Sequence, residues 1–176
     1  MRLTADSGLP RPASLLVQAL LLALSLLAPP ALRAQESSLP LGTKAPGAAV
    51  ERLDGKPADL AQYVGKTPVL IEFWATWCPN CRALEPAIKA AHAKYGRQVK
   101  CLGVAVSVNQ TPQRAKLYAE KHGLPLEILF DRKGAATSAY NVFATSTIVV
   151  LDRNGTVVYT GQGADQDIEA AVKKAL

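Results

Sequence analysis

Hydrophobic residues are arranged differently at the start of the chain and in the remainder. One unbroken apolar stretch covers residues 13–28 and stops at a pair of prolines. Beyond residue 48, short apolar segments alternate with amphipathic ones. Residues 68–74 (PVLIEFW) are almost continuously apolar, as expected of a central strand whose two faces are both covered. Residues 79–95 carry apolar side chains at helical spacing and are followed by Gly96, so they predict a helix.

The other segments predict an alternating order of strands and helices. A short hairpin is expected within residues 49–60 around Asp54-Gly55, and a second around Asn154-Gly155, whose sequence favours a two-residue turn. The last helix is expected to begin after Asp165 as its N-cap. The other predicted elements are a strand at 99–108, a helix at 111–122, a strand at 126–130, a short helix at 134–140, strands at 147–151 and 156–160, and a helix at 166–176. This order predicts an α/β sandwich around a mixed sheet.

The apolar stretch at the start has the features of a secretory signal peptide. It follows two arginines, is about 15 residues long and leads into small residues, whereas a membrane-spanning helix needs roughly 20 apolar residues. We predict cleavage after Ala34, with an uncleaved membrane anchor as the alternative. The expected organisation is therefore a signal peptide at 1–34, a linker or irregular arm at 35–47, and one domain at 48–176.

Composition excludes several classes of protein. Of the 176 residues, 49% are hydrophobic and 19% are charged, which rules out a disordered chain. The net charge of +6 is spread along the chain without a run of Lys and Arg, so no nucleic-acid partner is expected. Three cysteines are too few for a disulfide framework, and with two histidines they offer few ways to build a metal site. We therefore expect no metal or cofactor. A monomer is also expected.

The candidate chemistry lies at Cys78-Pro79-Asn80-Cys81. Cys78 is expected at a helix N-cap, where free backbone N–H groups and the positive end of the helix dipole stabilise a thiolate. Pro79 suits the first helical position because it needs no donor there. Cys81 lies one turn further on, within bonding range, so it can resolve a mixed disulfide. The alternatives are a zinc knuckle, which lacks a second ligand pair, and a structural disulfide, which would not need an exposed Cys78 beside Trp77.

The segment FWATWCPNC, with Pro86 five residues after the second cysteine, resembles the active site of the thioredoxin superfamily. The segments LDGKPADL and YNVFATSTIVVLDRNGTVVYTGQG resemble its exported branch, the redoxin-type thiol-disulfide oxidoreductases that serve cytochrome c maturation. The likeness covers residues 40–176. It implies a thioredoxin fold with an N-terminal β-hairpin extension, Cys78 as the nucleophile and Cys81 as the resolving thiol. It also implies protein disulfide or dithiol substrates and a membrane thiol electron donor.

The resemblance assigns further roles around the cysteines. In the family, an acid at the position of Glu72 lies beneath the second cysteine and relays its proton, and burial would raise the pKa of that carboxyl group. A solvent-facing position at the strand end is the alternative. The related reductases carry another acid three residues after the second cysteine, but this chain has Leu84 there, and Glu85 is expected to point away. Trp77 is expected to cover the nucleophile.

One departure from the family concerns the loop opposite the cysteines. The family has a cis-proline there, and its substrates pair their backbone with the preceding residue; these positions are Ser146 and Thr145 in this chain. A non-proline cis bond costs about 2.5–4 kcal/mol, so we expect a loop that is trans or strained. The alternative is a cis Ser146 whose hydroxyl group bonds to the Cys78 sulfur. The predicted site-shaping residues are thus Trp77, Pro79, Asn80, Thr145 and Ser146.

The leading prediction is an exported, periplasmic thiol-disulfide oxidoreductase that works as a reductase, and two other functions on the same fold are alternatives. A thiol peroxidase carries Thr three residues before its reactive cysteine, where this chain has Ala75. A non-catalytic metal or copper carrier would need a third ligand, and neither histidine has the spacing. Cys101 is interpreted as a buried, inert thiol, and His92 and His122 as ordinary surface residues.

Overall fold

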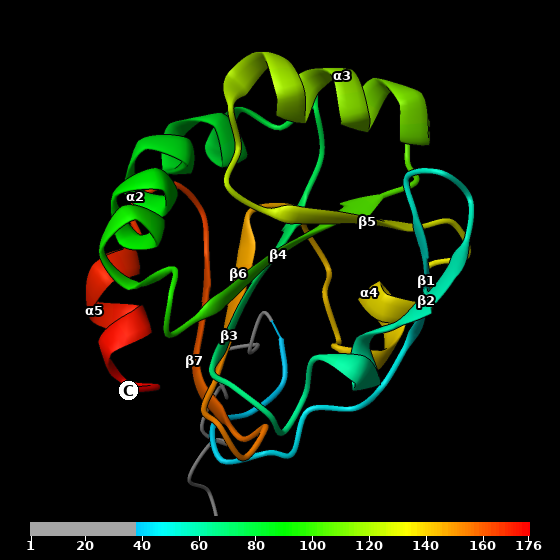
Figure 1. The fold of residues 1–176 in the computed structure, drawn as a ribbon. Coiled ribbons are helices and arrows are strands. Elements are labelled where there is room, and N and C mark those ends of the chain that lie inside the picture. The colour runs from blue at the N-terminus through cyan, green and yellow to red at the C-terminus, as the bar shows by residue number, and fades with distance from the viewer. Residues whose placement is uncertain (1–37) are drawn as a thin grey trace, which may run out of the picture. The chain divides into compact units, whose positions relative to one another are not determined.

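One mixed sheet of seven strands, in the order β2-β1-β5-β4-β3-β6-β7, forms the centre of the computed structural model, which describes residues 38–176 (Figure 1). Strand β3 runs parallel to β4, and β4 runs parallel to β5, whereas the other neighbours are antiparallel. The elements are β1 (Ala49–Arg52), β2 (Pro57–Asp59), the 3₁₀ helix η1 (Leu60–Gln62), β3 (Val69–Trp74), α2 (Pro79–Tyr95), β4 (Lys100–Val106), α3 (Pro112–His122), β5 (Glu127–Asp131), α4 (Ala135–Ala139), β6 (Thr147–Leu151), β7 (Val157–Gln162) and α5 (Ile168–Lys173). This is a thioredoxin-like α/β fold with the β1–β2 hairpin as its N-terminal extension, so the predicted fold class is confirmed.

The predicted signal peptide at 1–34 lies outside the described residues, as do residues 35–37 of the predicted arm. The proposed domain boundaries therefore stay predictions. Across residues 38–176, no helix combines the length and the hydrophobicity that crossing a membrane requires.

Residues 38–43 form neither helix nor strand, but hydrogen bonds connect them to the rest of the fold. The N–H of Gly42 donates to the carbonyl of Val157 at 2.8 Å, and the N–H of Val157 donates to the carbonyl of Thr43 at 2.9 Å. Ser38 is buried, and its hydroxyl group donates to the carbonyl of Tyr140 at 2.9 Å. The segment before β1 is thus tied to the start of β7 and to the end of α4.

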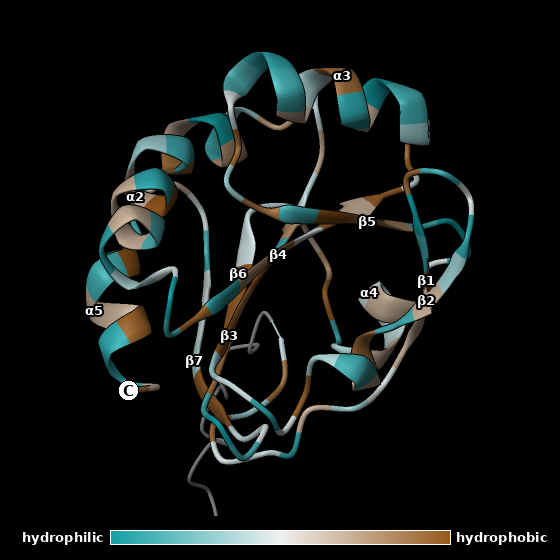
Figure 2. Cartoon of the chain, viewed as in Figure 1, coloured by the Kyte–Doolittle hydropathy of each residue, from teal (hydrophilic) through white to brown (hydrophobic). Residues whose placement is uncertain are grey.

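Side chains of β3 alternate between two hydrophobic layers, and all six residues of the strand are buried. Phe73 packs in the layer that contains Ala136 of α4, and Leu70 packs in the layer formed with α2 and α5. Helix α4 lies on the opposite side of the sheet from α2 and α5 (Figure 1). Figure 2 shows hydrophobic residues concentrated in the central strands. Because of the alternation, Glu72 and Trp74 share the face of Leu70, toward α2.

Helix α2 confirms the prediction from the sequence at both ends. Cys78 is its N-cap, Pro79 follows in the first turn, and Gly96 is its C-cap. Its buried residues recur at helical spacing, which places one face of the helix on the sheet: Cys81, Leu84, Ile88 and Ala91. The helix thereby carries the second cysteine toward the core.

The predicted two-residue turn between β6 and β7 is wrong. The turn contains three residues, 153–155, because the N–H of Asp152 donates to the carbonyl of Thr156 and the N–H of Gly155 donates to the carbonyl of Asp152, both at 2.9 Å. Gly155 has a φ of 75°, whereas a two-residue turn would need positive φ at Asn154 as well. The Asp152 carboxylate accepts the N–H groups of Asn154 and Thr156, both at 2.8 Å, and so stabilises the longer turn.

The last helix starts later than predicted, because its N-cap is Asp167 and not Asp165. The Asp167 carboxylate accepts the N–H of Ala170 at 2.9 Å. Gln166 does not join the helix because its side chain is turned back to the carbonyls of Ser146 and Gly163. Helix α5 therefore covers only Ile168–Lys173, with its apolar face against α2.

Candidate active site

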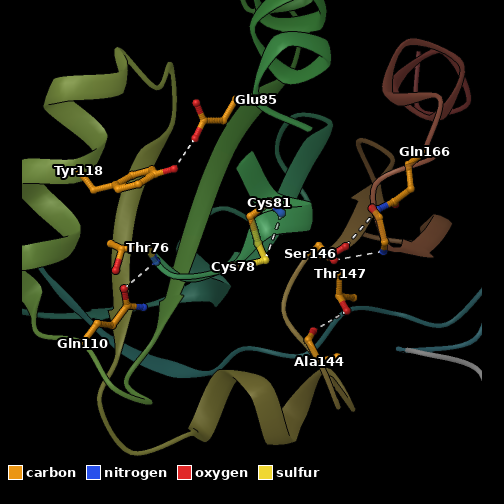
Figure 3. The surroundings of a disulfide bond; sticks show 11 residues. Thr76, Cys78, Cys81, Glu85, Gln110, Tyr118, Ala144, Ser146, Thr147 and Gln166 are labelled. Atoms are coloured by element: carbon orange, nitrogen blue, oxygen red, sulfur yellow. Dashed lines mark hydrogen bonds between the residues drawn. A yellow bond between two sulfur atoms is a disulfide. The ribbon is translucent and has the colours of Figure 1, made fainter. Parts of the chain in front are cut away.

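The two cysteines of the motif lie where β3 ends and α2 begins. Cys78 and Cys81 form a disulfide with their Cα atoms 5.3 Å apart, so the predicted bonding range is confirmed (Figure 3). The Cys78 sulfur accepts the N–H of Cys81 at 3.1 Å. Pro79 occupies the first turn of the helix, as expected. A reduced Cys78 would therefore face backbone N–H groups and the positive end of α2, both of which stabilise a thiolate.

Cys78 is not the exposed residue that the sequence argument assumed. In the disulfide it is 3% exposed, and Cys81 is 5% exposed. The N-cap geometry explains this burial, because it turns the Cys78 side chain toward the N–H of Cys81 and away from solvent. Trp77 is 42% exposed, and Pro79 and Asn80 are exposed at the start of α2. In the oxidised form, the Cys78 sulfur thus has little free surface, and the side chains on either side of it are exposed.

The loop before the disulfide is held by the connection between β4 and α3. Gln110 is buried, its Oε1 accepts the N–H of Thr76 at 3.0 Å, and its Nε2 donates to the carbonyl of Val106. The Trp77 Nε1 donates to the carbonyl of Val108 at 2.8 Å. Sequence reasoning missed Gln110, which lies 34 residues after Thr76 and belongs to no motif.

Glu72 is buried on the sheet face covered by α2. It is 3% exposed, and its Oε1 has no hydrogen-bond partner within the described part of the chain. Burial, followed by the negative charge of Glu85, raises the pKa of Glu72 to about 8. The predicted burial is confirmed, and the solvent-facing alternative is wrong. The carboxyl group can therefore hold or release a proton near neutral pH, where thiol chemistry takes place.

Glu85 points toward α3. Its side chain is 13% exposed, and the hydroxyl of Tyr118 donates to its Oε1 at 2.8 Å (Figure 3). The Nδ1 of His122 lies 2.9 Å from its Oε2. The rings of Tyr118 and His122 stack with centroids 3.9 Å apart. His122 is thus part of a cluster between two helices and not an ordinary surface residue, whereas His92 is half-buried on α2. No local pattern joins Glu85 to partners 33 and 37 residues away.

The loop that precedes β6 lies near the disulfide (Figure 3). Every peptide bond in residues 38–176 is trans, and Ser146 has a φ of 61°, a left-handed conformation that is unfavourable for residues other than glycine. The hydroxyl oxygen of Ser146 accepts the N–H of Gly163 at 3.1 Å. The expected trans, strained loop is confirmed, and the alternative of a cis Ser146 bonded to the Cys78 sulfur is wrong. A proline ring holds φ near −65° and could not take this conformation.

A cavity of about 280 Å³ opens beside this loop. Trp77, Val108, Phe143 and the half-buried Thr145 contribute to its lining. Phe143 is 67% exposed and Val108 is 59% exposed. An apolar surface next to a disulfide is suited to contact a polypeptide that brings its own disulfide to the site.

Comparison with known proteins agrees with this geometry. A model of the AhpC/TSA family matches residues 41–160, which is well over half of the chain. The chain belongs to the AhpC/TSA family.

Relatives of this AhpC/TSA protein include thiol-disulfide oxidoreductases. Thiol-disulfide oxidoreductase ResA of Geobacillus kaustophilus is 33% identical, over 77% of this chain and 78% of its own length. The thioredoxin-like protein YneN of Bacillus subtilis is 29% identical, over 77% of this chain and 80% of its own. A solved thiol:disulfide interchange protein of Chlorobium tepidum is 27% identical, with a TM-score of 0.63 over 78% of this chain and 98% of that one. Together with the Cys78–Cys81 pair, these similarities make the AhpC/TSA protein a thiol-disulfide oxidoreductase.

Two observations on this AhpC/TSA protein concern the alternative functions, a thiol peroxidase and a metal or copper carrier. Ala75, three residues before Cys78, is buried and carries no hydroxyl group, and the buried hydroxyl of the next residue, Thr76, has no partner within residues 38–176. In the same part of the chain, no group of three His, Cys, Asp or Glu side chains comes together as a metal site.

The third cysteine of the AhpC/TSA protein lies away from the disulfide. Cys101 pairs with Leu70, whereas the active-site loop follows Trp74, whose partner on β4 is Ala105. Cys101 is 7% exposed, and burial raises the pKa of its thiol to about 11. The prediction of a buried thiol is confirmed, and its inertness is open to a direct test.

Replacing Cys101 with alanine should leave the rate of disulfide exchange within about twofold of the wild type, because a buried thiol with a raised pKa is almost never a thiolate near pH 7. The rate is measured by following reduction of a disulfide-bonded protein by the pre-reduced variant. A large loss of exchange in a variant that folds normally would show that the third thiol participates.

Proposed function

We propose that this enzyme reduces disulfide bonds of proteins outside the cytoplasm, in the periplasm. The observation that carries the proposal is the Cys78–Cys81 disulfide at the N-terminus of α2, above a sheet face that buries Glu72. A redox-active pair, a helix end that stabilises a thiolate and a carboxyl group that holds a proton are the three parts that disulfide exchange needs.

Reduction of a substrate takes two exchange steps. The Cys78 thiolate attacks one sulfur of the substrate disulfide, a mixed disulfide forms, and the other substrate sulfur leaves as a thiolate that takes up a proton. The Cys81 thiol then loses its proton, and its thiolate attacks the Cys78 sulfur. The Cys78–Cys81 disulfide forms, the second substrate sulfur leaves, and two electrons have passed from the enzyme to the substrate.

Glu72 is proposed as the base of the second step. Its pKa of about 8 means that a fraction of the carboxyl groups is ionised near pH 7 and can accept the proton of Cys81. A carboxyl group with an ordinary pKa would be a weaker base, and a permanently neutral side chain could take no proton. The burial of Glu72 therefore supports a role in proton transfer.

The surface around the disulfide supports a polypeptide as the substrate. Phe143 and Val108 are exposed apolar side chains beside Trp77, and together they border the cavity next to the site. In the superfamily that this chain resembles, substrates pair their backbone with the residue at the position of Thr145. A substrate of this class is the oxidised cysteine pair of an exported apocytochrome c, which is the class that the resembled reductases serve.

The cellular setting of the proposal follows from the first 34 residues. A signal peptide there would export the domain, and a membrane-bound dithiol protein would then return electrons to the Cys78–Cys81 disulfide. The exchange with that donor is the reverse of the substrate reaction, so the same two cysteines serve both partners.

A redox titration together with a reduction assay tests the proposal. We expect the Cys78–Cys81 couple to titrate below about −200 mV, as glutaredoxins and thioredoxin do, and the reduced protein to reduce a disulfide-bonded protein such as insulin. A couple near about −120 mV would indicate an oxidant instead. Rapid consumption of hydrogen peroxide without protein disulfide reduction would favour the thiol peroxidase, and stoichiometric copper binding without either activity would favour the carrier.

A further inference from the structure

Ser146 holds a backbone conformation that requires support from its surroundings. It is fully buried with a φ of 61°, and a non-glycine residue persists there only where neighbouring contacts determine it. Phe73 pairs with Thr147 at the start of β6, so residues 144–146 lie at the same end of the sheet as the loop from β3 to Cys78. The conformation of Ser146 therefore sets the shape of the chain beside the disulfide.

The support comes from the connection between β7 and α5. The Gln166 Nε2 donates to the carbonyl of Ser146 at 3.0 Å and to the carbonyl of Gly163 at 2.8 Å (Figure 3). The N–H of Gly163 donates to the hydroxyl oxygen of Ser146 at 3.1 Å. The hydroxyl of Tyr159 donates to the Gln166 Oε1 at 3.2 Å and orients the amide. Both the carbonyl and the hydroxyl oxygen of Ser146 are thus bonded from this connection.

The residue before Ser146 has its backbone free for another partner. In the described part of the chain, neither the N–H nor the C=O of Thr145 makes a hydrogen bond. Thr145 is half-buried and lines the cavity beside the disulfide. Because backbone polar groups need partners, this free N–H and C=O can pair with an extended chain that enters the site.

We propose that Gln166 is a positioning residue for disulfide exchange, which holds the loop at Ser146 so that the backbone of Thr145 is presented to an extended substrate chain. The assignment rests on the proposed function, because it needs a polypeptide substrate. Gln166 touches neither the substrate nor the sulfur atoms and acts only through the loop. A small disulfide that does not use the Thr145 backbone should therefore not depend on it.

The variant Gln166→Glu tests this role with a side chain of the same shape. An ionised carboxylate still accepts the hydroxyl of Tyr159, but it cannot donate to the carbonyls of Ser146 and Gly163 and faces them with a negative charge. The loop should then leave the left-handed conformation for part of the time. Gln162→Glu makes the same chemical change at an exposed position at the end of β7 and is the matched control.

The experiment compares two substrates of the reduced enzyme, a disulfide-bonded peptide and a small aromatic disulfide. We expect Gln166→Glu to raise KM for the peptide about tenfold, which corresponds to the loss of about one hydrogen bond to the loop. The kcat for the peptide and the rate with the small disulfide should stay within about twofold. Gln162→Glu should leave both substrates unchanged.

Other results would overturn the assignment. Equal slowing with both substrates would show that Gln166 acts on the nucleophile or on the fold, and no change with either would show that the loop does not depend on it. If Gln166→Glu did not fold, Tyr159→Phe would test the same point, since it removes only the hydroxyl group that orients the amide; an unchanged peptide KM would then contradict the proposal. Failure of the wild type with every disulfide would count against the proposed function itself.

Discussion

Changing Cys78 to serine is expected to slow thiol-disulfide exchange by at least about 1,000-fold, because the nucleophile of the first step is removed. Changing Cys81 to serine should leave the first attack intact and stop the reaction at the mixed disulfide. The N-cap position of Cys78 and the N–H of Cys81 directed at its sulfur are the physical basis of this difference. Mass spectrometry of each variant after incubation with a disulfide-bonded substrate measures it.

The Cys78→Ser and Cys81→Ser variants also show which cysteine is the nucleophile and which one resolves the mixed disulfide. In the Cys81→Ser protein, absorbance of the Cys78 thiolate against pH should rise at a lower pH than for a free cysteine, whose midpoint is about 8.5. Accumulation of a mixed disulfide in Cys78→Ser, with none in Cys81→Ser, would reverse the assignment. Cys101→Ala is the control for nonspecific effects of removing a thiol.

Changing Glu72 to glutamine is expected to slow the resolution of a trapped mixed disulfide about 100-fold, because glutamine cannot accept the proton of Cys81. The first attack by Cys78 should change much less. In the wild type, the resolution rate should increase as the pH rises through about 8, where the carboxyl group ionises, and this inflection should be absent from the variant. Stopped-flow measurement of both steps between pH 6 and pH 9 provides the comparison.

The free energy of unfolding should also depend on Glu72, and the raised pKa determines the direction of that effect. The folded-state pKa of about 8 is above the ordinary value of 4.5, so the folded protein binds this proton more tightly than the unfolded chain. The contribution of Glu72 to the free energy of unfolding is therefore fully present below pH 4.5 and is lost as the pH rises toward 8. Glu72→Gln should consequently gain stability relative to the wild type over that range in urea unfolding.

Glu85→Gln is the control that separates charge from packing. It removes the negative charge that contributes to the raised pKa of Glu72, so the inflection of the wild-type resolution rate should move to lower pH. Equal slowing of both exchange steps in Glu72→Gln would indicate a packing role for this residue. An unchanged rate in both steps would mean that another group takes the proton from Cys81.

Features set by neighbouring residues could be predicted from the sequence. The apolar run of β3, the N-cap at Cys78 and the proline that follows are local signals, and the structure has all three where they were expected. The N-terminal hairpin likewise follows from its local sequence. Two local predictions were wrong because a side chain made a hydrogen bond that the pattern did not indicate. The Asp152 carboxylate stabilises a longer turn, and the Gln166 side chain bonds to the carbonyl of Ser146, so that Gln166 lies outside the helix.

Contacts between distant residues could not be predicted in the same way. Glu85 meets His122 only because α2 and α3 cover the same face of the sheet, and Gln110 reaches Thr76 only because the β4–α3 connection passes beside the active-site loop. The burial of Cys78 also depends on how the loop between β3 and α2 packs against the rest of the protein. Each of these depends on tertiary packing, for which a single sequence carries no periodic signal.

The two tryptophans near the disulfide make the redox state of the enzyme visible without a dye. Trp74 is 1% exposed in the core, whereas Trp77 is 42% exposed and immediately precedes Cys78. Indole fluorescence is quenched by a nearby disulfide, and a solvated indole emits at longer wavelength than a buried one. Trp74 packs in the same cluster as Cys78 and Cys81, so opening of the Cys78–Cys81 bond should brighten both the short-wavelength and the long-wavelength emission, and each turnover can be followed in real time.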